Sequence, residues 1–383
     1  MKMIFFLAIM IVGVMERLLG NDPGSAPSEF YLYVGAYTEN AEQGISIYKF
    51  DANQGGLSFI ATEKNVKNPS YLAINDKNNL LVAANEVGEY HGKKTGYVTS
   101  FSINSETGGL TKINEVASGG GAPCYVTVNK SASHAFVSNY SGGNVSIIPI
   151  QSDGRLSEYS DLKQHEGTGG NPARQKGPHA HFIELDPKQE FAIAVDLGMD
   201  KIISYKIDEK QGLLNESNQF SVQAGAGPRH LTFHPNKRLV FVISELNSTI
   251  SSLSYDSKEG KFSEVMTVST LPDDFNGTSY CADIHVSPNG KYVYGSNRGH
   301  NSIVVYQVDV KSGKLSYVDH TSVKGDWPRN FLIDPTGKFL LVANQKSDNI
   351  VVFKIDQESG RLRSNGVEVQ LPKPVCLKML AIR

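Results

Sequence analysis

One motif recurs seven times between Asn68 and the C-terminus of this 383-residue chain. Each copy opens with a short apolar strand introduced by a proline or its counterpart, and successive copies lie about 50 residues apart. These strands are expected to begin at Pro69, Pro123, Pro178, Pro228, Tyr280, Pro328 and Pro374. An all-β repeat of this length is typical of a β-propeller, in which each repeat forms one four-stranded blade. We therefore expect one ring-shaped domain rather than two or three separate domains.

The copy that begins at Pro228 shows how one blade is built. Its inner strand ends at the turn His234-Pro235, where proline suits the second turn position. The uninterrupted apolar run 239–243 follows, as expected for a strand that is buried on both faces. A polar loop, a third strand and a fourth strand that begins after Gly260 complete the pattern.

The two ends of the chain complement each other. Residues 31–37 and 44–50 have the pattern of a second and a third strand, and no inner strand precedes them. Residues 374–380 have the pattern of an inner strand, and no second strand follows. Because an open sheet edge is unfavourable, we expect the two ends to share the first blade. The predicted fold is an all-β, seven-bladed β-propeller over residues 30–383, with its first blade closed by both chain ends.

The first residues have a different character. Lys2 precedes an apolar run from Met3 to Met15, and Gly20 provides a small residue at a suitable cleavage point. This pattern predicts a signal peptide over residues 1–20, followed by a linker over residues 21–29. The run is too short for a stable membrane span. We expect a secreted or periplasmic protein. The alternatives are that the apolar run stays as an uncleaved anchor, or that the chain starts at Met15 and is cytoplasmic.

Charge and cysteine content narrow the range of partners. The formal net charge is −2 and the basic residues are scattered, so neither a nucleic-acid partner nor a membrane surface is indicated. Cys124, Cys281 and Cys376 occupy near-equivalent places at the starts of inner strands. We interpret them as small buried residues rather than a disulfide framework, and we expect a monomer.

Propeller topology predicts which side chains meet at the axis. The inner strand starts at the face where the antiparallel second strand ends, so both sets of residues converge there. The residues at the starts of inner strands include His179, His181, Arg229, His230 and Arg329. The residues at the ends of second strands include Glu86, Tyr140, Asp196, Glu245, Arg298 and Gln345. Arg174 lies in the long loop before His179 and is expected to join this candidate site.

Some polar residues at this face have a structural interpretation. Asn85, Asn139, Asn297 and Asn344 recur from blade to blade, as framework residues would. Asp196 could likewise cap a turn instead of binding a ligand, and His234 and His285 are interpreted as structural. His179, Arg229, Glu245 and Arg298 differ between blades, which indicates a specific role because charged groups near the axis need partners or a ligand.

At these residues the chain resembles the propeller-type 6-phosphogluconolactonases. The resemblance covers residues 30–383 and is carried by Tyr33-Val-Gly-Ala-Tyr-Thr, Asn68-Pro-Ser-Tyr-Leu, Asn171-Pro-Ala-Arg-Gln-Lys-Gly-Pro-His-Ala-His, Gly227-Pro-Arg-His, Ser296-Asn-Arg-Gly-His and Pro328-Arg-Asn-Phe. It implies a seven-bladed propeller that hydrolyses a sugar lactone. A related fungal class acts on muconate-type lactones, and that class implies catalytic roles for one of His179 and His181, with Arg229, Glu245 and Arg298. A secreted protein would make the phosphosugar a doubtful substrate, because that substrate is cytosolic.

Lactone hydrolysis needs an activated water and a group that stabilises the developing negative oxygen. Histidine suits the role of base and arginine that of anion clamp. We therefore assign His179 or His181 as the base, Glu245 as its orienting partner or an alternative base, and Arg229 and Arg298 as clamps. The remaining site residues are expected to bind the substrate.

We expect no cofactor and no metal. Two histidines with Asp196 and Glu245 form the alternative metal set, but two neighbouring arginines oppose it. A non-catalytic propeller that only binds a ligand remains the rival to an enzyme.

Overall fold

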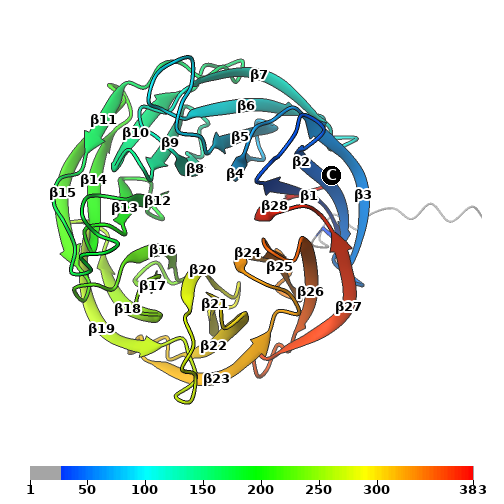
Figure 1. The fold of residues 1–383 in the computed structure, drawn as a ribbon, viewed down its shortest axis with the longest axis vertical. Helices are drawn as coiled ribbons and strands as arrows, with labels where there is room; N and C mark the ends of the chain where they lie inside the picture. The colour runs from blue at the N-terminus through cyan, green and yellow to red at the C-terminus, as the bar shows by residue number, and fades with distance from the viewer. Residues whose placement is uncertain (1–26, 383) are drawn as a thin grey trace, which may run out of the picture.

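The computed structural model describes residues 27–382, which form seven four-stranded antiparallel sheets around a central axis (Figure 1). The inner strands are β28 (Pro374–Ala381), β4 (Pro69–Asn75), β8 (Pro123–Val128), β12 (Ala180–Leu185), β16 (Pro228–Phe233), β20 (Tyr280–Val286) and β24 (Pro328–Ile333). The second strands are β1 (Glu29–Ala36), β5 (Leu80–Asn85), β9 (His134–Asn139), β13 (Phe191–Asp196), β17 (Leu239–Ser244), β21 (Tyr292–Arg298) and β25 (Phe339–Asn344). The predicted seven-bladed propeller is confirmed.

The outer half of each blade is equally regular. The third strands are β2 (Gly44–Asp51), β6 (Tyr97–Ile103), β10 (Asn144–Pro149), β14 (Lys201–Asp208), β18 (Thr249–Asp256), β22 (Ser302–Val308) and β26 (Asn349–Ile355). The outer strands are β3 (Gly56–Lys64), β7 (Leu110–Ala117), β11 (Asp161–Gln164), β15 (Leu213–Ser221), β19 (Lys261–Ser269), β23 (Leu315–Ser322) and β27 (Leu362–Gln370).

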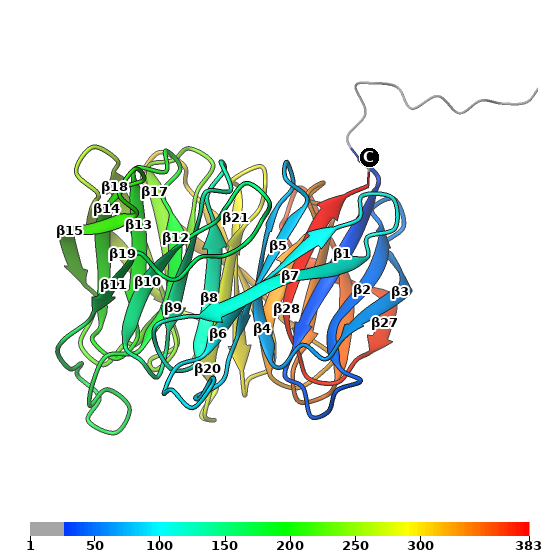
Figure 2. The same ribbon diagram turned by 90° about the horizontal axis from the view of Figure 1, so that it is seen from above.

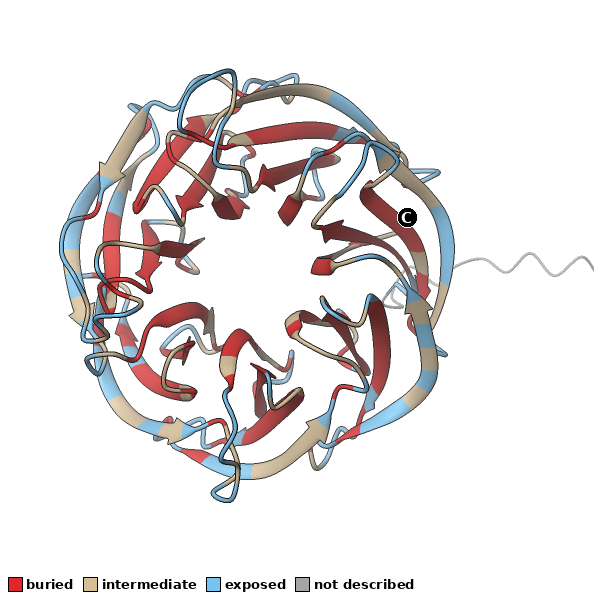
Figure 3. Cartoon of the chain, viewed as in Figure 1, coloured by how far each residue is buried: buried red, intermediate tan, exposed pale blue. Residues whose placement is uncertain are grey.

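Burial follows the distance of each strand from the axis. Every residue of β17 is buried, as the apolar run 239–243 predicts, because neighbouring blades cover both faces of a second strand. In β27 exposed positions alternate with less exposed ones, since only one face of an outer strand meets a neighbouring blade. Figure 3 shows this gradient from the buried middle of each blade to the exposed rim. The core is therefore a ring between blades, and the axis is left for polar side chains.

The two ends of the chain close the ring. Strand β28 pairs antiparallel with β1, with Tyr31 opposite Leu380 and Val34 opposite Leu377, and the sheet order is β28-β1-β2-β3. Figure 2 shows the two ends of the chain side by side in this blade. The predicted closure is confirmed. The hydrogen bonds between β28 and β1 join the last strand of the chain to the first, and this pairing closes the ring.

The recurring asparagines have the framework role that the sequence indicates. Each side-chain amide donates to a backbone carbonyl of the segment that leads into its own blade: Asn85 to Lys67, Asn139 to Ser118, Asn297 to Thr270 and Asn344 to Val323. All four residues are buried at the ends of second strands. They hold the crossing between adjacent blades and do not face the axis as ligands. His234 is also structural, because its Nε2 bonds to the carbonyl oxygen of Gly290 in the next blade.

The expected signal peptide over residues 1–20 and most of the expected linker lie outside the described residues. The linker was expected to reach residue 29, whereas β1 already begins at Glu29, where Ala52 and Ile382 pair with the backbone around it. Within residues 27–382, no helix has the length and hydropathy that a membrane crossing requires.

A candidate active site at the starts of the inner strands

A β-bulge near the start of every inner strand aims side chains at one face of the ring. In six blades the pairing with the second strand skips one residue at this point, and in the blade of β20 both Ala282 and Asp283 lie opposite Ser296, so each inner strand accommodates one extra residue. The extra residues are Val375, Ser70, Cys124, His181, Arg229, Ala282 and Arg329. A bulge bends its strand and redirects the side chain of the extra residue. The bulges therefore decide which residues at the strand starts reach the axis.

The expected strand start at Tyr280 is confirmed, since β20 begins there, but the start expected at Pro178 is wrong. Ala180 pairs with Asp196, so Ala180 corresponds to the prolines that begin other inner strands. The difference decides between the two candidate histidines, because His181 occupies the bulge position and His179 precedes the strand.

The face holds a cavity of about 420 Å³. Its lining residues are Tyr37, Glu86, Cys124, Tyr140, Arg174, His181, Glu245, Tyr280, Arg298, Trp327, Arg329 and Gln345. Eight of the twelve predicted site residues are among them. These eight come from the strand starts, the strand ends and the preceding loops of six of the seven blades. The candidate site is thus built by the ring as a whole, and no single blade could form it.

Glu245 is the centre of an arginine cluster. Its carboxylate accepts hydrogen bonds from Nη2 of Arg298 at 2.7 Å, Nη2 of Arg174 at 2.9 Å and Nε of Arg229 at 3.1 Å. Arg229 and Glu245 are almost completely buried, while the side chain of Arg174 is 38% exposed. The expected pairing of Glu245 with a histidine is therefore wrong. The carboxylate orients arginines instead.

Each arginine that lines the cavity lies against an aromatic ring. The guanidinium carbon of Arg298 is 5.4 Å from the ring centre of Trp327, that of Arg329 is 5.4 Å from Tyr37, and that of Arg174 is 5.7 Å from Tyr280. A planar guanidinium held over an aromatic face keeps a fixed orientation and still presents donors at its edge. The cavity therefore offers several oriented donors to one bound anion.

The cluster carries a surplus of positive charge. Four arginines (174, 229, 298 and 329) meet three carboxylates, Glu86 and Glu245 in the cavity and Asp283 near Arg229, which leaves one positive charge uncompensated. Arg329 is the least committed of the four, since its contact with Glu86 is long at 3.8 Å and its guanidinium makes no hydrogen bond within residues 27–382. Such a surplus in a partly closed cavity favours an anionic ligand.

The same charges determine the protonation states. Burial by itself raises the pKa of Glu245, but the charges of Arg298, Arg229 and Arg174 more than offset burial and lower the pKa to about 2. Burial, with the charges of Arg298 and Arg329, lowers the pKa of Arg229 to about 10, so this group stays protonated at neutral pH. Glu245 is therefore too weak a base to accept a proton from water at neutral pH.

His181 is the histidine of the cavity. It is 4% exposed, and its Nδ1 has no hydrogen-bond partner within the described chain. Burial, followed by the positive charges of Arg229 and neighbouring groups, lowers the pKa of His181 well below its usual value. The imidazole is therefore neutral at physiological pH and able to accept a proton.

Four predicted site residues lie outside the cavity lining. His179 stacks on Tyr140 at a ring distance of 4.5 Å, with its Nδ1 3.1 Å from the carbonyl oxygen of Tyr140. Asp196 caps a turn, as its alternative interpretation held, because its carboxylate accepts from the backbone amides of His179 and Gly198 and pairs with His165. His230 and Arg229 lie beneath the cavity. The expectation that Asp196 and His230 bind substrate is not met by this arrangement.

Four lining residues were not predicted: Tyr37, Cys124, Tyr280 and Trp327. Tyr37 directly follows the second strand of the first blade, so the rule that selected Glu86 and Gln345 would have found it, had it been applied to the blade built from both ends. Trp327 is the only tryptophan of the chain and precedes β24 with a positive φ of 67°. No sequence pattern signals this left-handed backbone, so the place of the ring in the cavity could not be predicted.

No metal centre is evident in the described part of the chain. Residues 27–382 contain no group of three or more His, Cys, Asp or Glu side chains arranged to hold a metal ion. The alternative metal set is also dispersed, since Asp196 pairs with His165 while Glu245 pairs with arginines. All three cysteines are free and buried, as expected.

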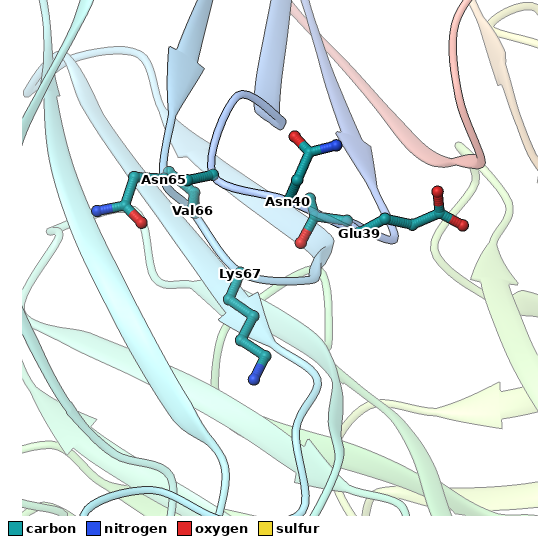
Figure 4. A pocket seen from close by; sticks show the side chains of 7 residues that line it. Glu39, Asn40, Asn65, Val66 and Lys67 are labelled. Carbon is teal, nitrogen blue, oxygen red and sulfur yellow. The ribbon is translucent and has the colours of Figure 1, made fainter.

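A second hollow lies outside the arginine cluster. It measures about 160 Å³ and is lined by Thr38, Glu39, Asn40, Ala41, Asn65, Val66 and Lys67 (Figure 4). Figure 4 shows the charged ends of Glu39 and Lys67 pointing apart. It contains neither a histidine nor an arginine, so it lacks the side chains that the arginine cluster combines.

Comparisons with known proteins agree with the seven-bladed fold. The model of the family described as "Lactonase, 7-bladed beta-propeller" matches residues 31–379. The 6-phosphogluconolactonase of Bacillus subtilis is 38% identical over 348 residues, which cover 91% of this chain and 97% of that protein. The structure of a periplasmic gluconolactonase from Pseudomonas aeruginosa has a TM-score of 0.87 and 30% identity, covering 93% of this chain and 100% of that one. A protein of known structure from Lactobacillus plantarum has a TM-score of 0.85 and 32% identity, covering 92% and 99%.

Proposed function

This chain belongs to the family of seven-bladed β-propeller lactonases, and from that membership and the cavity we propose that it hydrolyses a sugar lactone to the corresponding hydroxy acid. The observation that carries the proposal is the meeting of a neutral buried histidine with aromatic-braced arginines in one cavity. The histidine supplies a base for water, and the arginines supply donors for the oxygen that becomes negative.

The proton balance of the reaction suits this arrangement. Water attacks the lactone carbonyl carbon and gives its proton to His181, while the carbonyl oxygen becomes an oxyanion that Arg298 and Arg329 stabilise. Collapse of the tetrahedral intermediate breaks the bond to the ring oxygen, which takes the proton back from His181. Because the surrounding arginines disfavour a protonated His181, they favour return of this proton. Glu245 orients Arg298 and is not itself the base.

The charge surplus favours a lactone that carries an anionic group. Arg174 is the most exposed arginine of the cavity and bonds to Glu245 through a single nitrogen. It also hydrogen-bonds to Tyr140, and its remaining donors face a phosphate or carboxylate that enters from the open face. Relatives named as a 6-phosphogluconolactonase and a gluconolactonase support aldonolactones as the substrate class. The substrates after which these two relatives are named differ in whether they carry a phosphate.

A panel of lactones tests the proposal. Purified protein is assayed with a pH indicator on 6-phosphogluconolactone, gluconolactone and a muconolactone-type substrate, with the uncatalysed rate subtracted. We expect kcat/KM to fall by about 10²-fold in Arg298→Ala, which removes a donor to the oxyanion. Lys67→Ala, in the hollow of Figure 4, is the matched control and should retain full activity.

Each outcome of the panel has a distinct meaning. Turnover that requires Arg298 supports the proposal. Turnover that survives both Arg298→Ala and Arg329→Ala would place the active site elsewhere. Ring closure of a muconate, faster than lactone opening, would favour a cycloisomerase. A complete lack of turnover would favour a ligand-binding propeller.

We also propose that the protein acts outside the cytoplasm, because the basic start and apolar run of residues 1–20 have the pattern of a signal peptide. This location would favour an unphosphorylated lactone over a cytosolic phosphosugar. Mass spectrometry of the protein from its native host tests this: an N-terminus shortly after Gly20 supports export, and an intact Met1 or a start at Met15 contradicts it.

A further inference from the structure

A second ring of side chains lies directly beneath the bulge residues. It consists of the residue that follows each bulge: Cys376, Tyr71, Tyr125, Phe182, His230, Asp283 and Asn330. All of them are buried. Most are aromatic or small, as expected for packing, but His230 and Asp283 form a buried hydrogen-bonded pair that does not line the cavity. A buried carboxylate away from the ligand is costly unless its partners compensate for it.

The hydrogen bonds that link Asp283 to His230 and His230 to Arg229 have only one possible direction. Oδ1 of Asp283 lies 2.8 Å from Nδ1 of His230, and a carboxylate only accepts, so Nδ1 carries the proton. Burial and the charge of Arg229 outweigh the contribution of Asp283 and lower the pKa of His230 to about 4, so the ring is neutral. Nε2 is then an acceptor, and it lies 3.3 Å from Nη1 of Arg229, which only donates. The opposite tautomer would place two donors against each other.

Asp283 is held so that it cannot turn away. Its Oδ1 also accepts from the backbone amide of Ile284 at 3.0 Å, and its Oδ2 accepts from Nε2 of His285 at 3.1 Å and from the side-chain amide of Asn330. The carboxylate therefore defines the position and the tautomer of His230. This also gives His285 a specific role as a brace, consistent with its structural interpretation.

Arg229 links His230 to Glu245, which lines the cavity. Its Nη1 donates to the carbonyl oxygen of Ala282 at 2.5 Å, and its Nε donates to Glu245 at 3.1 Å. Glu245 in turn accepts from Arg298 and Arg174, which line the cavity. A shift of Arg229 would therefore move the carboxylate to which both cavity arginines are bonded.

We propose that Asp283 and His230 are positioning residues, which fix the tautomer of His230 and thereby lock Arg229 and Glu245 so that Arg298 and Arg174 face the substrate. The inference rests on the proposed lactonase function for its kinetic readout, but its structural readout is independent of turnover. Neither residue touches the cavity, so both act through Arg229.

The substitution Asp283→Asn tests the proposal. An Asn at position 283 has one acceptor oxygen in place of two. With its oxygen towards His230 and the amide of Ile284 it loses the bonds from His285 and Asn330, and in the other orientation its amide nitrogen faces Nδ1 of His230. We expect kcat to fall about tenfold or more with KM changed less than about threefold, because the geometry of the reacting donors suffers more than binding. In ¹⁵N spectra of the imidazoles, part of the His230 population should carry its proton on Nε2 instead of Nδ1; His230→Gln assigns the signal.

A double-substitution cycle separates positioning from general support. His230→Gln keeps an acceptor oxygen for Arg229 but removes the link to Asp283. If Asp283 acts through His230, adding Asp283→Asn to His230→Gln should cost less than about threefold in kcat, whereas a purely structural role costs the same in both backgrounds. Asp334→Asn is the matched control: Asp334 is equally buried, but it holds the turn to Phe339 at the opposite face, so it should lower Tm and leave kcat unchanged.

Two outcomes would overturn the inference: an unchanged His230 tautomer in Asp283→Asn, or equal costs of Asp283→Asn in both backgrounds. If Asp283→Asn does not fold, His230→Gln is compared with His230→Phe, since Phe occupies the equivalent position 182 of the neighbouring blade. Gln should then retain activity that Phe loses by about tenfold, and equal activities would refute the proposal. If the wild-type protein is inactive, only the lactonase function is rejected, because the tautomer measurement tests the positioning role without turnover.

Discussion

Replacing Glu245 by Gln should destabilise the protein and change how its stability depends on pH. The carboxylate is nearly buried among three guanidinium groups, and its pKa falls from an ordinary 4.5 to about 2 in the folded protein. At about 1.4 kcal/mol for each pKa unit, this difference corresponds to about 3 kcal/mol of unfolding free energy at neutral pH. The figure is in the range of about 3–5 kcal/mol expected when a buried ion pair loses one partner.

The sign of the pH dependence follows from the depressed pKa. Above pH 4.5 Glu245 is ionised in both the folded and the unfolded chain, and its full stabilisation is present. As pH falls towards 2, the unfolded chain binds a proton before the folded protein does, so the stabilisation is lost. The difference in unfolding free energy between wild type and Glu245→Gln should therefore fall to less than half by pH 3.

Urea unfolding at pH 7 and pH 3 measures this difference. Trp327 is the only tryptophan and lies against Arg298, so its fluorescence reports on the cavity, while far-UV circular dichroism reports on the strands. Glu39→Gln is the control, because the ion pair of Glu39 with Lys373 is at the surface, and its midpoint should match that of wild type. A difference below about 1 kcal/mol at pH 7, or one that is equal at the two pH values, would refute the proposed electrostatic role of Glu245.

Three further predictions follow from the architecture. Deleting residues 372–383 removes β28, which contributes the buried side chains of Val375 and Leu377 and the hydrogen bonds that close the first blade; calorimetry should show a sharply lower Tm, and an unchanged Tm would contradict the closure. His181→Gln should reduce kcat by about 10²–10⁴-fold with circular dichroism unchanged, whereas His179→Gln should retain most activity; the reverse order would identify the other histidine as the base. Dialysis against a chelator should leave kcat/KM unchanged, and activity restored only by added metal would show that the arginine cluster is not the catalytic centre.

The repeat in the sequence was sufficient to predict the ring, the number of blades and their closure. Strand patterns depend on local alternation and on turn residues such as His234-Pro235, which has counterparts in Asp186-Pro187, Ser287-Pro288 and Asp334-Pro335. Topology then made the polar residues at strand starts and strand ends converge, because antiparallel neighbours share a face. For this reason Glu86, Arg298 and Gln345 could be assigned to the cavity without coordinates.

What each side chain does there depended on tertiary contacts. A bulge shifts a strand by one residue, and this shift placed His181 rather than His179 in the cavity, although both lie in the same short segment. Arg229 was expected to clamp an anion, yet it does not line the cavity, and its Nε and Nη1 bond to Glu245, Ala282 and His230. The partners of a buried charge come from distant blades, so their pairing cannot be predicted from spacing along the chain.

The sequence by itself determined the architecture, because a propeller is specified blade by blade through hydrophobic pattern and turn chemistry that act over a few residues. Only the tertiary structure decided the roles within the site, because these depend on displacements of one residue in register and on hydrogen-bond directions among groups from several blades. Asp283 illustrates the limit: along the chain it is one polar residue in an inner strand, whereas in the ring its carboxylate meets His230, His285 and Asn330.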